Sequence, residues 1–120
     1  MDIAMTYEKI IEILSGNLYH TCFTYEEARI TNFVASDLMS DVLVLEDEEF
    51  LLITSLSSEQ AVRTADIVGA RGILLVNGKK PQPGMVTLAK ELNKTLITTS
   101  QRMFRVCALL GRELDKEGLL

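Results

Sequence analysis

Few residues of this chain are of a type that could support catalysis or bind a metal, and their spacing restricts the possible chemistry. His20 is the only histidine, and Cys22 follows it on the same side of an extended segment. Asp37 and Asp41 are four residues apart, so a helix would place both carboxylates on one face, as metal ligands or as acids. A pair in which one carboxylate caps a helix and the other is solvated is more common. We therefore expect neither a catalytic site nor a metal site.

Gly78 and Lys79 come closest to a nucleotide-binding loop. A Walker-type loop needs a glycine, four residues and then Gly-Lys-Ser/Thr. The first glycine and the hydroxyl residue after Lys79 are both missing, so the chain has no visible way to hold a triphosphate for phosphoryl transfer. We expect a protein that is not an enzyme and has no cofactor. A hydrolase or transferase that uses Asp37, Asp41 or His20 is the less favoured alternative.

Between Phe50 and Ser100 the chain repeats one unit three times. Each unit has an apolar run, a short polar turn and the periodicity of an amphipathic helix, and the three runs are FLLITS, GILLVNG and TLITTS. This alternation is typical of parallel strands covered by helices. The sequence therefore predicts a single α/β domain over residues 1–120, with a largely parallel sheet in two or three layers.

Polar residues follow each of these runs, where the strands are expected to end. In open parallel sheets, ligands bind beyond the carboxyl ends of the strands. The candidate ligand-binding residues are Thr54, Ser55, Ser57, Ser58, Asn77, Gly78, Thr98, Thr99 and Ser100. Their hydroxyl and backbone N–H groups, together with two helix N-termini, suit a carboxylate, a phosphate or a nucleotide ribose. Helix capping alone would also explain them.

The first half of the chain has weaker patterns. We expect a helix that Thr6 caps and that Gly16 ends in a left-handed conformation. Residues 17–22 and 29–35 have the composition of short strands. Asp37 is expected to cap a short helix that follows it.

Two further helix starts are predicted in the second half. Ser57 and Gln60 have the spacing of a capping box, and Ser100 is expected to cap the last helix. The buried residues of that helix would be Met103, Phe104, Cys107 and Leu110. We expect the packed part of the domain to cover residues 5–111, with a frayed tail after Gly111.

The composition indicates a small globular protein. Its 120 residues suffice for one domain, and 48% hydrophobic with 24% charged residues is not the composition of a disordered chain. The net charge of −5 and the acidic run at residues 46–49 argue against nucleic acid as a partner. Because there is no apolar run of about 20 residues and no signal-peptide pattern, we expect a cytoplasmic protein without a membrane span. The two cysteines are too few for a metal motif, and Cys107 is expected to be a buried small hydrophobe.

The N-terminal half offers more apolar surface than one thin layer of a sheet has to bury. The first helix, the run RITNFVA and the run LMSDVLVL all contribute to this surface. We expect a two-fold homodimer built from this half of the chain. A charged residue in place of Phe33 or Val42 should then dissociate the dimer.

Three segments together resemble the DRTGG domain family: SDLMSDVL at residues 36–43, LLITSLSSEQ with GILLVNGKKPQPGMVTLAKE, and TLITTSQRMFRVCALLG. The run from Asp37 to Val42 is the most specific of them, and its polar residues are Asp37, Ser40 and Asp41. The resemblance covers nearly the whole chain and implies a fold like that of the N-terminal domain of HPr kinase. The kinase activity of those proteins belongs to a separate P-loop domain.

The chain departs from the two motifs that give the family its name. Ser57 and Ser58 stand in place of an acid and an arginine, and Asn77-Gly78 replaces a diglycine. The resemblance still implies a non-catalytic regulatory or ligand-sensing module, which in relatives with CBS domains accompanies regulation by adenine nucleotides. We therefore expect a homodimer that binds a small anionic or nucleotide-like effector. A structural adaptor without a small ligand, acting on a protein encoded nearby, is the alternative.

Overall fold

The three apolar runs form adjacent parallel strands, as their pattern predicts. In the computed structural model, which describes residues 5–120, the elements are α1 (Tyr7–Leu14), β1 (Asn17–His20), β2 (Phe33–Ala35), α2 (Met39–Val42), β3 (Leu51–Thr54), α3 (Glu59–Val68), β4 (Gly72–Leu75), α4 (Pro83–Glu91), β5 (Thr95–Thr98) and α5 (Met103–Lys116). The strands form one sheet in the order β1-β5-β4-β3-β2. Strands β2 to β5 are parallel, and β1 pairs antiparallel with β5 at the edge. The predicted α/β class with a largely parallel sheet is confirmed.

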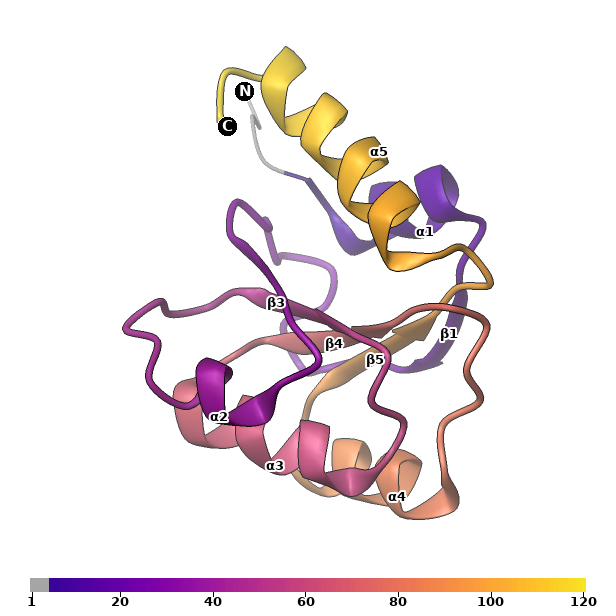
Figure 1. Ribbon diagram of the computed structural model, residues 1–120. Helices are drawn as coiled ribbons and strands as arrows, with labels where there is room; N and C mark the ends of the chain where they lie inside the picture. Colours follow the sequence, from indigo (N-terminus) through magenta and orange to yellow (C-terminus); the bar gives the residue numbers. More distant parts are fainter. Residues whose placement is uncertain (1–4) are drawn as a thin grey trace.

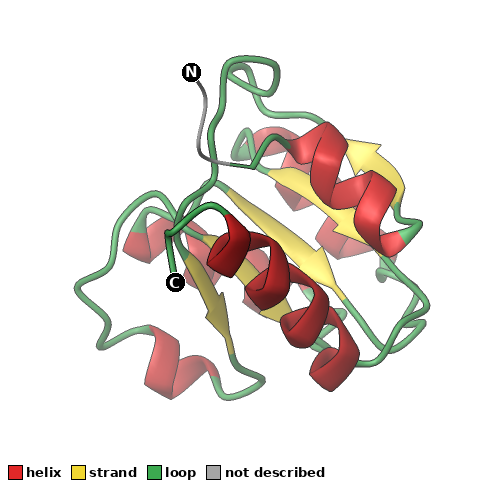
Figure 2. Ribbon diagram, turned by 90° about the horizontal axis from the view of Figure 1, so that it is seen from above, coloured by secondary structure: helices red, strands yellow, loops and turns green. Residues whose placement is uncertain are grey.

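The sheet lies between two layers of helices, so the fold has three layers (Figure 1). Helices α1 and α5 cover one face, and α2, α3 and α4 cover the other. Figure 2, seen from the side of α5, shows this helix lying over the strands. Strands β3, β4 and β5 are buried along their whole length because helices cover both of their faces.

The end of the first helix differs from the prediction by one residue. Thr6 caps α1 as expected, and its hydroxyl accepts a hydrogen bond from the Lys9 backbone N–H at 3.1 Å. The left-handed residue, however, is Ser15, with a φ of 50°, and not Gly16. Gly16 has another role, because a Cβ there would make a tight contact, 3.1 Å from the Thr98 carbonyl oxygen of β5. The glycine lets this turn approach the sheet closely.

Both strands predicted in the N-terminal half are present, but they are shorter than expected. Residues 17–20 form β1 and residues 33–35 form β2. Ahead of β2, Ile30 is fully buried and pairs with Met5 in an isolated bridge. Both strands lie at the edges of the sheet, which explains why neither has the continuous burial of the central strands.

Helices α2 and α3 begin without the predicted caps. Leu38 is at the N-cap of α2 and Ser58 is at the N-cap of α3, and within residues 5–120 neither side chain makes a capping hydrogen bond. Asp37 contacts β3 instead, as described below. Ser57 holds its loop through its carbonyl oxygen, which accepts a hydrogen bond from the Gln82 N–H at 2.9 Å. The capping predictions for Asp37 and Ser57 are therefore wrong: the Asp37 carboxylate binds β3 instead, and α3 begins one residue later than the capping box predicts.

The last helix begins later than predicted. Its first residue is Met103, and Arg102, rather than Ser100, occupies the N-cap position. The Met103 backbone N–H donates a hydrogen bond to the side-chain oxygen of Asn77 at 3.0 Å. An asparagine from the loop after β4 thus supplies the cap from outside the helix.

The same helix also ends later than predicted, because it continues through Gly111 to Lys116. Leu114 is 7% exposed, whereas Phe104, which the sequence predicts to be buried, is 86% exposed. The core-facing positions of the helix are Val106, Leu110 and Leu114. These positions are four residues apart, so the buried stripe runs into the segment for which the sequence predicts fraying.

Candidate functional site

The carboxyl ends of the central strands lie next to one another, and we call this end of the sheet the carboxyl edge. It is distinct from the lateral edges, which are formed by β1 and β2. Thr54 of β3 lies beside Leu75 of β4, which in turn lies beside Thr98 of β5. The loops after these strands therefore leave the sheet together, and α3, α4 and α5 begin at this edge. The tertiary structure brings the predicted site residues to one edge, but they differ in what they contact there.

The β3 end of the carboxyl edge is occupied by a side chain of the protein itself. The Asp37 carboxylate accepts hydrogen bonds from the Ser55 backbone N–H at 2.6 Å, the Ser55 hydroxyl at 2.8 Å and the Thr54 hydroxyl at 3.1 Å. Burial raises the pKa of Asp37, but these hydrogen bonds and the positive charge of Lys79 outweigh it and hold the pKa below its ordinary value. An internal anion thus already binds the groups predicted to bind a ligand at Thr54 and Ser55.

Two more of the predicted residues hold the backbone in place. Thr99 is 1% exposed, and its hydroxyl donates to the Leu14 carbonyl oxygen at 2.9 Å and accepts from the Gln101 N–H at 3.2 Å. Asn77 has a φ of 66°, and its side-chain oxygen accepts the hydrogen bond from Met103 described above. For these two residues the structural alternative, capping and loop fixation, accounts for the polar side chains.

The loop before α3 contains a second internal carboxylate. Ser57 and Ser58 are half-buried in this loop. The next residue, Glu59, reaches the start of α4, where its carboxylate oxygen would lie 3.2 Å from a Cβ at Gly84. A negative side chain therefore faces the positive end of α4, which favours the close approach of the two helix starts.

The β5 end of the carboxyl edge contains a cavity of about 180 Å³, which we call the edge cavity. Its lining residues are Asn17, Tyr19, Gly78, Lys79, Lys80, Thr98, Thr99 and Ser100. Among these, the sequence predicts Gly78, Thr98, Thr99 and Ser100 as candidate site residues. Asn17 and Tyr19 belong to β1 and are not predicted, because local patterns do not reveal that β1 pairs with β5. The described residues that line this cavity include two lysines and no acidic side chain.

The distribution of charge along the chain is a further signal for this cavity. Residues 67–112 contain eight Lys or Arg and one acidic residue, Glu91, so their local net charge is +7 although the whole chain has a net charge of −5. Lys79 and Lys80 lie in the loop after β4, and Arg102 and Arg105 lie at the start of α5. These four cations stand at the carboxyl edge, where they attract anions.

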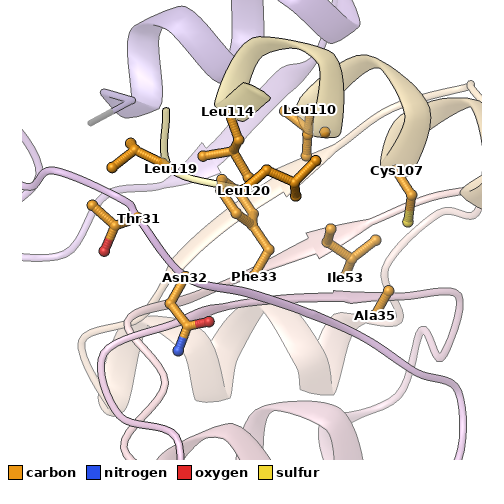
Figure 3. A pocket seen from close by; sticks show the side chains of 11 residues that line it. Thr31, Asn32, Phe33, Ala35, Ile53, Cys107, Leu110, Leu114, Leu119 and Leu120 are labelled. Carbon is orange, nitrogen blue, oxygen red and sulfur yellow. The ribbon is translucent and has the colours of Figure 1, made fainter. Parts of the chain in front are cut away.

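A second, apolar cavity of about 330 Å³ lies between α5, β2 and β3 (Figure 3). Phe33 and Ile53 line it from the sheet, and Thr31 and Asn32 are its polar residues. Cys107, predicted to be a buried small hydrophobe, is half-buried in its wall, and burial raises the pKa of the thiol. The raised pKa favours the uncharged thiol at neutral pH.

The residues considered for catalysis do not converge. His20 lies near the start of β5, away from the carboxyl edge, and its Nδ1 is 2.9 Å from the Lys94 carbonyl oxygen. Cys22 is buried. Ser40 and Asp41 are exposed on α2. Within residues 5–120, no group of three or more His, Cys, Asp or Glu side chains is arranged to hold a metal ion. None of the helices in this described part is long and apolar enough to cross a membrane.

No family model matches the chain, and no curated protein matches it. The fold is similar to that of the CBS and DRTGG domains from the regulatory region of Clostridium perfringens pyrophosphatase, which was crystallised with its activator diadenosine tetraphosphate. The TM-score is 0.75 at 17% sequence identity, and the similarity covers 98% of this chain. It covers 51% of the other chain, so this protein spans about half of that length. The predicted resemblance to the DRTGG domain family is confirmed at the level of the fold.

Proposed function

We propose that this chain, which has a DRTGG-like fold, is a non-catalytic regulatory module that binds a small anionic or nucleotide-like effector in the edge cavity. The observation that carries the proposal is the pair Lys79 and Lys80 in a cavity at the carboxyl ends of β4 and β5. Thr98 and Ser100, which line the same cavity, supply hydroxyl donors. The start of α5 follows Ser100 by three residues and adds the positive end of a helix dipole on this side of the sheet.

The size and shape of the cavity indicate which part of an effector would bind there. A volume of about 180 Å³ is below the roughly 300 Å³ of the smallest sites that enclose a drug-sized ligand. We therefore expect a phosphate or carboxylate group to bind between the lysines, with the rest of the effector lying along the surface. Tyr19 is 42% exposed in the cavity wall and offers a face on which a base can stack. The activator bound to the similar regulatory region, a dinucleoside tetraphosphate, supports a nucleotide-like effector.

Calorimetric titration with AMP, ATP and diadenosine tetraphosphate tests the proposal. The double variant Lys79→Gln/Lys80→Gln should bind the effector at least tenfold more weakly than the wild type. The matched control Lys90→Gln/Lys116→Gln removes the same charge from other parts of the surface and should stay within about twofold. Absence of binding for all three nucleotides at millimolar concentration, or equal affinity in both double variants, would contradict the assignment.

We also propose that the module is a homodimer formed through its N-terminal half. Val42 is fully buried and so is unsuitable as a test position, since a charge there would disrupt the core. Leu38, Leu43 and Val44 flank α2 and are 57%, 46% and 78% exposed. Val44→Glu should convert a dimer into a monomer in light scattering while circular dichroism shows that the fold is retained; its melting temperature should fall to that of the diluted wild type. A wild type that is monomeric at every concentration would contradict the dimer and would also count against the adaptor alternative.

A further inference from the structure

The opposite edge of the sheet, where β3, β4 and β5 begin, contains another polar cavity, which we call the amino-edge cavity. Its volume is about 270 Å³. Arg71 and Lys94 line it together with Thr24 and Asn93. Arg71 directly precedes β4 and Lys94 directly precedes β5, and the first residues of these strands are partners in the parallel ladder. The sheet therefore places the two cationic residues at equivalent positions on neighbouring strands.

Both cations are more buried than the carboxylates that face them. The side chains of Lys94 and Arg71 are 13% and 26% exposed, while those of their partners Asp66 and Glu49 are 46% and 72% exposed. Each pair is separated by 3.4 Å. An ion pair with a largely exposed carboxylate is weak because water screens it and the acidic side chain must be held in place. The cations thus keep much of their capacity to bind another anion.

The hydrogen-bond donors of these residues are not fully used within residues 5–120. The Nε–H of Arg71 is buried and has no hydrogen-bond partner in this part of the chain. A buried donor without a partner is destabilising, so contacts within the described residues leave the guanidinium incompletely satisfied. The Lys94 ammonium has three N–H donors, and one of them is used by the Ala70 carbonyl oxygen at 2.9 Å.

We propose that Arg71 and Lys94 form a second anion site, for a phosphate group that is either free or carried as a small monoester. A guanidinium and an ammonium that line one cavity are suited to several oxygens of one phosphate. The groups that oppose binding are Glu49, Asp66 and the carbonyl ends of α3 and α4. Because Glu49 is the most exposed of these groups, the phosphate binds in competition with it. This site is independent of the edge cavity.

The experiment is an amide NMR titration of the full chain with inorganic phosphate and, separately, with glycerol 3-phosphate, at constant pH and ionic strength. Saturating shifts are expected at the amides around Arg71 and Lys94. Arg71→Gln and Lys94→Gln should each weaken the affinity at least tenfold, with folding verified from the spectrum. Glu49→Gln should strengthen it severalfold, because it removes the competing carboxylate. This gain distinguishes a binding site from a structural ion pair, whose loss would bring no increase in affinity.

The control for this titration is Lys79→Gln/Lys80→Gln, which should leave the affinity of the amino-edge cavity unchanged. Tighter binding of inorganic phosphate than of glycerol 3-phosphate would identify free phosphate as the ligand. The reverse order would identify a phosphate monoester. Unchanged affinity in both Arg71→Gln and Lys94→Gln would overturn the proposal. It would equally be overturned by the lack of saturation for both probes, or by shifts confined to the residues of the edge cavity.

Discussion

Replacement of Asp37 by alanine is expected to destabilise the protein markedly, although this carboxylate lies on the surface. Its oxygens accept three hydrogen bonds from Thr54 and Ser55, and Thr54 is fully buried. Hydrogen bonds to a charged group contribute roughly 1.5–3 kcal/mol each. Solvent screening around an exposed carboxylate reduces this considerably, so we expect a total loss of about 2 kcal/mol. The unfolding entropy of a chain of this length is about 250 cal/mol/K, which corresponds to a fall in Tm of about 8 °C.

Two related variants give this prediction its controls. Asp37→Asn keeps one acceptor oxygen and should lose about half of the stability that Asp37→Ala loses. Asp41→Asn removes an exposed carboxylate from the same segment of the chain. It should change the free energy of unfolding by less than about 0.5 kcal/mol. Thermal melts followed by circular dichroism measure all three. If Asp37→Ala and Asp41→Asn melted within 1 °C of each other, the hydrogen bonds of Asp37 would have no net value and the reasoning would be refuted.

The pH dependence gives an independent check on Asp37. Its pKa in the folded protein lies below the ordinary value of 3.8, so the folded state binds fewer protons than the unfolded state in that range. The contribution of the charge to stability is therefore complete above about pH 5 and is lost as the pH falls through the folded pKa. The stability difference between wild type and Asp37→Asn should be constant from pH 5 to 7 and shrink below pH 4. A difference that grows on acidification would show that the sign is wrong.

Four further variants test the packing. Gly72→Ala should destabilise by roughly 1–3 kcal/mol, because the new Cβ would lie 2.8 Å from the Thr95 carbonyl oxygen in the adjacent strand; urea unfolding measures this, and an unchanged midpoint would contradict the close approach. Gly111→Ala should stabilise by about 0.5–1 kcal/mol, since no atom lies within 4 Å of a Cβ there and alanine is the better helix residue; a lower Tm would argue against a continuous α5. Leu114→Ala should cost about 2–4 kcal/mol while Phe104→Ala stays within about 0.5 kcal/mol; comparable losses in the two variants would mean that the burial assigned to α5 is incorrect.

The sequence was sufficient to predict the central part of the fold. The runs over β3, β4 and β5 are mostly apolar and are buried at every position, because helices cover both faces of a parallel strand. Once these strands are parallel, their polar ends at Thr54, Asn77 and Thr98 have to meet at one edge. That argument depends only on local pattern and chain direction, and it holds in the structure.

The hydrogen-bond partner of each polar group at that edge could not be predicted from local sequence patterns. Asp37 was expected to cap the helix after it, yet it binds residues 17 and 18 positions away. Thr99 bonds to the carbonyl oxygen of Leu14, 85 residues earlier, and Asn77 caps a helix that begins 26 residues later. Such partners depend on how whole elements pack, and no window of sequence contains both members of the pair.

The amino-acid sequence by itself therefore determined the type of each central element and the edge at which polar groups gather, because hydrophobic period and strand direction are local properties. Tertiary structure alone decided which of those groups are already hydrogen-bonded within the chain and which face a cavity. Which groups are hydrogen-bonded and which face a cavity depends on the order of the strands, with β1 beside β5 and β2 beside β3. It arises from burial of the whole apolar surface at once, which is a property of the packed chain and not of any segment.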